Sequence, residues 1–158
     1  MDIPDDFKKL FALEGIEERL ELLESLVTPA KKGELITLSS LADEELAAFF
    51  TRYIAHPNHA NDADGKLRKR ATFDDKIQAL GRVLPKLDAD PKNYQSHLDF
   101  LSAVRILRNT AAHNSGLHMD DAMEFSKNPE MLSMVADFPK KLWERVTALR
   151  DYLTALPL

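Results

Sequence analysis

Two guanidinium groups, an amide and an imidazole are concentrated in one short segment of the chain. Arg105, Arg108, Asn109 and His113 fall within little more than two turns of a helix. At about 100° per residue they occupy one arc of the helix, together with Ala112. The adjacent stripe is apolar and narrow, and it consists of Phe100, Val104, Leu107 and Ala111. One side of this helix is therefore predicted to be core, with a polar side next to it.

The polar residue types suit chemistry on a phosphodiester. An arginine fork matches phosphate oxygens and stabilises charge that develops on them, and a histidine can move a proton near neutral pH. Asn109, one turn before His113, would orient the imidazole or a bound phosphate. A structural alternative stays open, in which the arginines pair with carboxylates of neighbouring helices. His113 would then be a helix C-cap favoured by the helix dipole.

Composition limits the classes of protein and of chemistry. The chain has 158 residues, about the size of one domain, with 44% hydrophobic and 30% charged residues, which is typical of a globular protein. It contains no cysteine, so disulfides and thiolate chemistry are excluded. The first residues have no signal-peptide pattern, and no apolar run approaches the roughly 18 residues of a membrane span. We therefore expect a cytoplasmic protein without a membrane-spanning segment.

The formal net charge of −5 gives no general attraction to nucleic acid. If the chain binds RNA, it must do so through a local basic patch. The dense basic run consists of Lys66, Arg68, Lys69 and Arg70. It is a candidate for binding the RNA backbone, and the alternative is a solvated loop.

Helical periodicity dominates the first half of the chain. Helices are predicted over residues 4–13 and 16–26, followed by a turn at 29–33 and an extended segment at 34–38. Ser40 is predicted to cap a third helix that ends near Ile54. Residues 55–70 form the longest irregular stretch. Phe49, Phe50 and Trp143 are expected in the core, with a dimer face as the alternative.

The second half also has helix signals. Thr72 and Asp75 resemble a capping box, opening a helix that Pro85 would end. A cap and a first-turn proline, Asp90 and Pro91, open the long helix that runs to about His113. Further helices are predicted to begin near residues 128 and 139. The prediction is an all-α bundle of about six to seven helices, with residues 1–158 as one domain and residues 40–117 as its centre.

Two segments resemble a known family. Arg108-Asn109-Thr110-Ala111-Ala112-His113 is similar to the Arg, polar, three variable residues, His motif of the HEPN superfamily (higher eukaryotes and prokaryotes nucleotide-binding). Residues 71–84, with Thr72-Phe73 and Leu80-Gly81, look like the corresponding segment of mannitol operon repressor-like HEPN proteins. The resemblance covers residues 43–117, about half of the chain.

This resemblance implies a helical bundle that forms a homodimer and brings two motifs together at a shared cleft. In active members the pair of motifs is a metal-independent RNA endonuclease, and many members are toxins or defence proteins. Arg108 would then hold the scissile phosphate, His113 would be the acid or base, and Asn109 would support them. Arg105 would be a second phosphate contact. The resemblance implies no cofactor.

The alternative within the same family is a non-catalytic regulator that binds a nucleotide or a protein. An antitoxin or a regulatory protein is then the expected partner. His56, His59, Asp62 and Asp64 lie close together in the sequence and are residue types that can bind a metal ion. Their spacing fails the calcium-loop pattern, so a polar loop is the better interpretation.

Overall fold

Helices make up the part of the chain that the structure, a computed structural model, describes. Residues 29–59, 71–112, 124 and 140–158 are described. No strand occurs among them, so the predicted all-α class is confirmed. The elements are α3 (Pro29–Ala55), the short 3-10 helix η1 (Pro57–His59), α5 (Phe73–Leu87), α6 (Pro91–Ala112) and α9 (Lys140–Ala155). The helices predicted over residues 4–13, over 16–26 and near residue 128 lie outside the described residues, so the total of six to seven stays a prediction.

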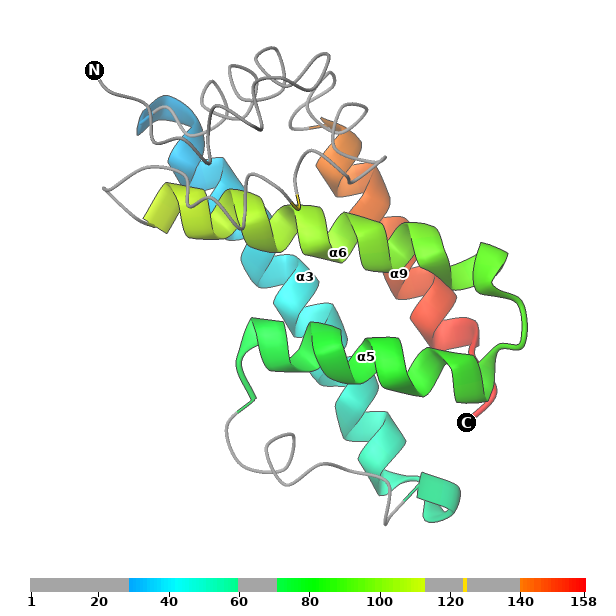
Figure 1. The fold of residues 1–158 in the computed structure, drawn as a ribbon. Helices are drawn as coiled ribbons and strands as arrows, with labels where there is room; N and C mark the ends of the chain where they lie inside the picture. Colours follow the sequence, from blue (N-terminus) through cyan, green and yellow to red (C-terminus); the bar gives the residue numbers. More distant parts are fainter. Residues whose placement is uncertain (1–28, 60–70, 113–123, 125–139) are drawn as a thin grey trace, which may run out of the picture.

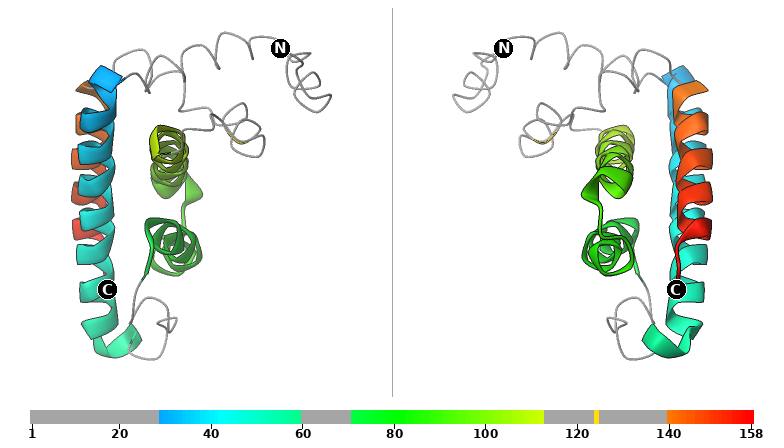
Figure 2. Two further views of the ribbon diagram at one scale, coloured as in Figure 1. Left: turned by 90° about the vertical axis from the view of Figure 1, so that its left-hand side faces the viewer. Right: turned by 90° about the vertical axis from the view of Figure 1, so that its right-hand side faces the viewer.

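The four long helices form two layers that cross steeply. In Figure 1, α5 and α6 lie in front of α3 and α9. Figure 2 shows α3 and α9 lengthwise and side by side, while α5 and α6 are seen nearly end on. Helix α3 contacts α5, α6 and α9, and α6 also contacts α5 and α9. Helix α3 thus contacts each of the other three long helices.

The hydrophobic core lies between these layers and draws on all four long helices. Phe49, Tyr53 and Phe100 are among its largest fully buried side chains. The aromatic residues of α3 also contact one another, with ring centroids of Phe49 and Phe50 5.2 Å apart. Burial of side chains of this size contributes roughly 1.5–3 kcal/mol each. The core therefore fixes the position of α6, on which the candidate site residues lie.

The prediction for residues 29–40 was wrong. Instead of a turn, an extended segment and a cap at Ser40, the chain forms one helix, α3, from Pro29. Proline is tolerated in the first turn of a helix, where its missing N–H would have no partner. The buried positions repeat at helical spacing through the whole segment: Leu35, Leu38, Ala42, Leu46, Phe49 and Tyr53. Packing of this stripe outweighs the low helix propensity of the glycine and threonine within it.

Local hydrogen bonds show how the polar residues of this segment fit into the helix. Thr37 Oγ1 donates to Gly33 O at 2.9 Å, and the buried Ser39 donates from Oγ to Ile36 O at 2.9 Å. Hydroxyls that bond back to the preceding turn need no other partner. Ser39 can therefore be buried inside a continuous helix, and the neighbouring Ser40 is not a cap.

Helix α5 begins as predicted and ends later than predicted. The capping box is confirmed: Thr72 Oγ1 accepts from Asp75 N–H and Asp75 Oδ2 accepts from Thr72 N–H, both at 3.1 Å. Pro85 does not end the helix, which continues to Leu87. A proline within a helix lacks the N–H that would donate to the carbonyl four residues earlier, and its ring crowds that carbonyl. The next turn still closes, because Asp88 N–H donates to Leu84 O at 2.8 Å.

Helix α6 begins at Pro91, as the Asp90-Pro91 pair predicted, and Asp90 Oδ1 accepts from Lys92 N–H at 3.0 Å. The apolar stripe is confirmed for Phe100, Val104 and Leu107, and it is wider than predicted. Leu101, Ala103 and Ile106 are also fully buried. The side chain of Ala111 lies outside the described residues. Helix α6 thus has a broad core face because both α3 and α5 pack on it.

The C-terminal helix α9 contributes Val146, Leu149 and Leu153 to the core. The prediction that Trp143 belongs to the core was wrong, since 47% of this residue is exposed, while Phe49 and Phe50 are buried as predicted. Among the described helices, none is both long and apolar enough to span a lipid bilayer.

Candidate functional site

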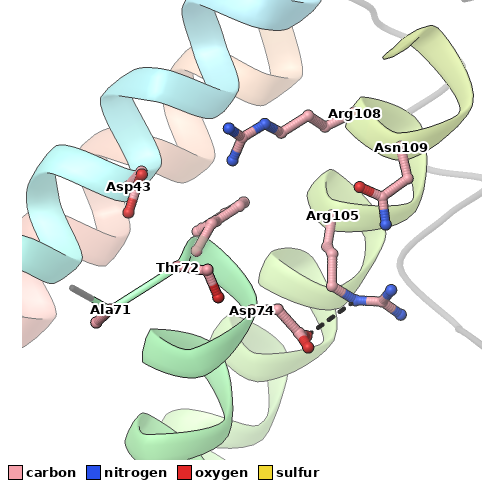
Figure 3. A pocket seen from close by; sticks show the side chains of 8 residues that line it. Asp43, Ala71, Thr72, Asp74, Arg105, Arg108 and Asn109 are labelled. Carbon is pink, nitrogen blue, oxygen red and sulfur yellow. Dashed lines mark ion pairs between the residues drawn. The ribbon is translucent and has the colours of Figure 1, made fainter. Parts of the chain in front are cut away.

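Three helices meet around a pocket at the C-terminal half of α6. The pocket has a volume of about 510 Å³ and includes Arg105, Arg108 and Asn109 of α6 in its lining. Asp43 of α3 and residues 71–74, at the start of α5, complete the lining. Figure 3 shows these side chains around the space between the three helices. The structure therefore brings together three of the predicted site residues, and it adds two carboxylates that the sequence analysis had not assigned to the site.

The start of α5 contributes backbone N–H groups near the pocket. The first N–H groups of a helix have no acceptor within it, and they carry the positive end of the helix dipole. The capping box takes up the N–H groups of Thr72 and Asp75. The residues between them, Phe73 and Asp74, are in the first turn of α5 and line the pocket. The local field at this end of α5 favours an anion.

Arg105 is held by carboxylates. Its Nε lies 3.6 Å from Asp74 Oδ1, and its Nη2 forms an ion pair with Glu124. The side chain of Arg105 is 19% exposed, compared with 53% for Asp74. In Figure 3 a dashed line joins Nε of Arg105 to Asp74, and the terminal nitrogens of the guanidinium point away from Asp74. The positive charge of Arg105 is therefore compensated within the chain.

Arg108 has different surroundings. Its guanidinium carbon lies 5.5 Å from the centroid of the Phe73 ring, at a distance typical of a cation–π contact. No ion pair joins Arg108 to a carboxylate within residues 29–59, 71–112, 124 and 140–158. Figure 3 shows its guanidinium pointing into the space between α3 and α5. Phe73 thus contacts a cation that forms no ion pair with a described carboxylate.

Asp43 reaches the pocket from α3 and already has a cationic partner. Lys76 Nζ donates to Asp43 Oδ1 at 2.7 Å, and both side chains are largely buried. This ion pair connects α3 with α5 beside the pocket. Nothing in the spacing of the sequence connects Asp43 with the segment around Arg108, because the two lie on helices that meet only in the fold. Asp74 had a local signal, since it lies within the capping box that opens α5.

Five of the predicted site residues lie outside the described residues. They are the proposed acid or base His113, directly after the last residue of α6, and the basic run of Lys66, Arg68, Lys69 and Arg70. Their roles therefore stay predictions from the sequence.

His56 and His59, two of the four residues of the possible metal site, lie at the C-terminal end of α3, away from the pocket. The His59 ring stacks on Tyr53 with centroids 4.2 Å apart, and the His56 ring lies 5.4 Å from it. Within the described part of the chain, no group of three or more histidine, aspartate or glutamate side chains is placed to hold a metal ion. Asp62 and Asp64 lie outside that part.

A second polar cluster connects α6 with α9 far from the pocket. The His97 ring stacks on Tyr152 at 4.7 Å, and Tyr152 Oη donates to Asp88 Oδ2 at 2.9 Å. Arg145 Nη2 donates to Ser96 O at 2.7 Å. His97 is eleven residues before Arg108, which corresponds to roughly 16 Å along a helix. This cluster therefore belongs to the packing of α9 and not to the pocket.

The pKa values in this cluster are shifted by its surroundings. Burial, and then the charge of Arg145, lower the pKa of His97 below its usual value of 6.5. The hydrogen bond from the Asp90 backbone, and then that from Tyr152, lower the pKa of Asp88 below 3.8. Burial and the bond to Asp88 raise the pKa of Tyr152. His97 is therefore neutral in the folded protein at neutral pH.

Comparison with known proteins gave no relative. No protein-family model matches the chain, no curated protein matches it, and no solved structure matches its fold.

Proposed function

We propose that the chain is a metal-independent RNA endonuclease of the HEPN type that works as a homodimer. The observation that carries the proposal concerns Arg108. This arginine lines the pocket, and none of the described carboxylates forms an ion pair with it. A phosphodiester is a ligand that such a guanidinium binds through paired hydrogen bonds. Asn109 and the first turn of α5 add donors at the same pocket.

In the proposed reaction the 2′-oxygen of a ribose attacks the adjacent phosphorus, and the bond from phosphorus to the 5′-oxygen breaks. The proton of the 2′-hydroxyl is taken up by a base, and a proton is delivered to the leaving 5′-oxygen. His113 takes up the proton of the 2′-hydroxyl and delivers a proton to the leaving 5′-oxygen, and Arg108 stabilises the charge on the phosphate oxygens. The products are a 2′,3′-cyclic phosphate and a 5′-hydroxyl. No step requires a metal ion or a cofactor.

The test is cleavage of single-stranded RNA by the purified protein in excess EDTA. His113→Ala and Arg108→Ala should each lower the rate by at least roughly a hundredfold, a typical loss for a general acid–base or charge-stabilising group. Arg150→Ala, at an exposed arginine of α9, is the matched control and should retain activity. RNA with a 2′-deoxy sugar at the scissile position should not be cleaved. Full activity of His113→Ala would contradict the proposal, provided that a thermal melt shows the variants to be folded.

A non-catalytic regulator of the same family is the second candidate, and Arg105 favours it. Its charge is taken up by Asp74 and Glu124, which removes the second phosphate contact that the catalytic proposal assigned to it. The net charge of −5 points in the same direction. In that case the pocket binds a nucleotide, and Arg108→Ala abolishes binding in a protein that cleaves no RNA. An antitoxin or another regulatory protein remains the proposed partner in either case.

A further inference from the structure

We propose that Asp74 is a specificity-determining residue that makes the pocket select a phosphodiester over a phosphomonoester. The inference rests on the proposed function, because it takes the pocket to be a phosphate site. It goes beyond that function by naming a residue that rejects the wrong ligand. Asp74 is suited to this role because it is a carboxylate in the lining of a pocket that otherwise attracts anions.

The charged side chains around the pocket can be grouped by the ion pairs that they form. Lys76 and Asp43 form one balanced pair at 2.7 Å. Arg105 is shared by Asp74 and Glu124, so this group carries one surplus negative charge. Arg108 is the cation that no described carboxylate balances. The pocket therefore presents one guanidinium to a ligand and has a surplus carboxylate charge beside it.

A phosphodiester carries one negative charge, and Arg108 balances it. A phosphomonoester carries about 1.5 to 2 negative charges at pH 7, because its second pKa is about 6. The described residues that line the pocket offer no further unpaired cation for the additional charge, which faces the carboxylate of Asp74. Like charges in a partly desolvated pocket repel strongly enough to change affinity by an order of magnitude. The pocket should thus favour internal phosphates of a chain over terminal ones.

The position of Asp74 is fixed by local structure. It lies in the first turn of α5, its Oδ2 accepts from Gln78 Nε2 at 3.2 Å, and its Oδ1 faces Arg105. Figure 3 shows Asp74 and Arg108 on opposite sides of the pocket opening, with Asp74 turned to Arg105. Asp74→Asn keeps the size and shape of the side chain and an oxygen acceptor for Gln78, and it removes the negative charge together with the ion pair to Arg105.

The ligands for the test differ only by a methyl group. One is a 2′-O-methyl nucleoside 3′-phosphate, a monoester, and the other is its phosphate methyl ester, a diester; the 2′-O-methyl group prevents cleavage. Isothermal titration calorimetry gives the dissociation constant of each ligand with the wild-type protein, with Asp74→Asn and with Arg108→Ala. Asp151→Asn removes the same charge from an exposed position on α9 and is the matched control.

We expect the wild-type protein to bind the diester more tightly. Asp74→Asn should strengthen binding of the monoester more than that of the diester, because repulsion scales with ligand charge, and the preference should shrink by roughly tenfold. Asp151→Asn should leave the preference unchanged. Equal binding of the two ligands by the wild-type protein, or an unchanged preference in Asp74→Asn, would overturn the role of Asp74. Absence of binding, or binding that Arg108→Ala does not weaken, would instead overturn the phosphate site itself.

Discussion

His97 shows what burial does to a single titratable group. Its Nδ1 is buried without a hydrogen-bond partner, its ring stacks on Tyr152, and Arg145 lies close enough to oppose a positive charge on it. The folded state therefore takes up the proton of His97 only at a lower pH than the unfolded chain does. The unfolded chain binds it near pH 6.5. The contribution of neutral His97 to the free energy of unfolding is therefore fully present above pH 6.5. It falls as the pH drops from 6.5 toward the pKa of His97 in the folded state.

Replacing His97 by phenylalanine tests this relation. His97→Phe keeps the stacking on Tyr152 and removes both the titration and the unpaired Nδ1. At pH 7.5 the free energy of unfolding should stay within roughly 1 kcal/mol of the wild-type value, as for other swaps of similar volume. Between pH 6.5 and pH 5 the wild-type protein should lose stability and the variant should lose less. Urea denaturation at several pH values measures this, and parallel pH profiles would contradict the assignment.

The pocket illustrates which residues a sequence can reveal. Arg105, Arg108 and Asn109 lie on one helix, so helical arithmetic alone placed them together, and the structure confirms that they line one pocket. Asp43 and Asp74 were not predicted as site residues. Asp43 lies on α3, and its proximity to Arg108 depends on how α3 crosses α5 and α6. Such pairings between helices leave no periodic signal in the chain.

At the scale of elements, the helix starts that carry a capping signal were predictable. The capping box of Thr72 and Asp75 and the Asp90-Pro91 pair stabilise helix starts through hydrogen bonds to backbone groups nearby in the sequence. Their residue types therefore suffice to locate the starts of α5 and α6. Two other expectations were wrong: α5 continues past Pro85 to Leu87, and residues 29–33, expected to form a turn, are the first part of α3. In both cases burial of leucines beyond the expected break decides the outcome: the partly buried Leu87 in α5, and Leu35 and Leu38 in α3. Tertiary packing outweighs local propensity there.

The cap of α5 can be tested by itself. Thr72→Ala removes the hydroxyl that accepts from Asp75 N–H, and it should lower the free energy of unfolding by about 1 kcal/mol, the usual cost of losing an N-cap. Thr72→Ser keeps the hydroxyl and is the matched control, with stability close to that of the wild-type protein. Chemical denaturation of both variants measures the difference. Equal loss in the two variants would show that the methyl group, and not the hydrogen bond, stabilises the start of α5.

At the scale of the molecule, the pocket lies where the start of α5 and the C-terminal half of α6 meet α3. Helix α3 passes behind α5 and α6, and Asp43 is its contribution to the pocket (Figure 1). Arg108 points into this pocket, and no described carboxylate forms an ion pair with it. The proposed homodimer would add a second Arg108 and a second His113 to the same cleft. A dimeric site of this kind makes activity depend on association.

If the site is shared by two chains, the cleavage activity depends on the protein concentration. If two chains form each cleft, the rate of RNA cleavage per chain should fall when the protein is diluted below the dimer dissociation constant, because monomers lack half of the site. Analytical ultracentrifugation gives that constant, and cleavage rates measured across the same concentrations should follow the fraction of dimer. His113→Ala should dimerise like the wild-type protein, since the proposed role of His113 is chemical. A rate per chain that stays constant while the dimer dissociates would show that one chain holds a complete site, and Arg108 would then act alone on its phosphate.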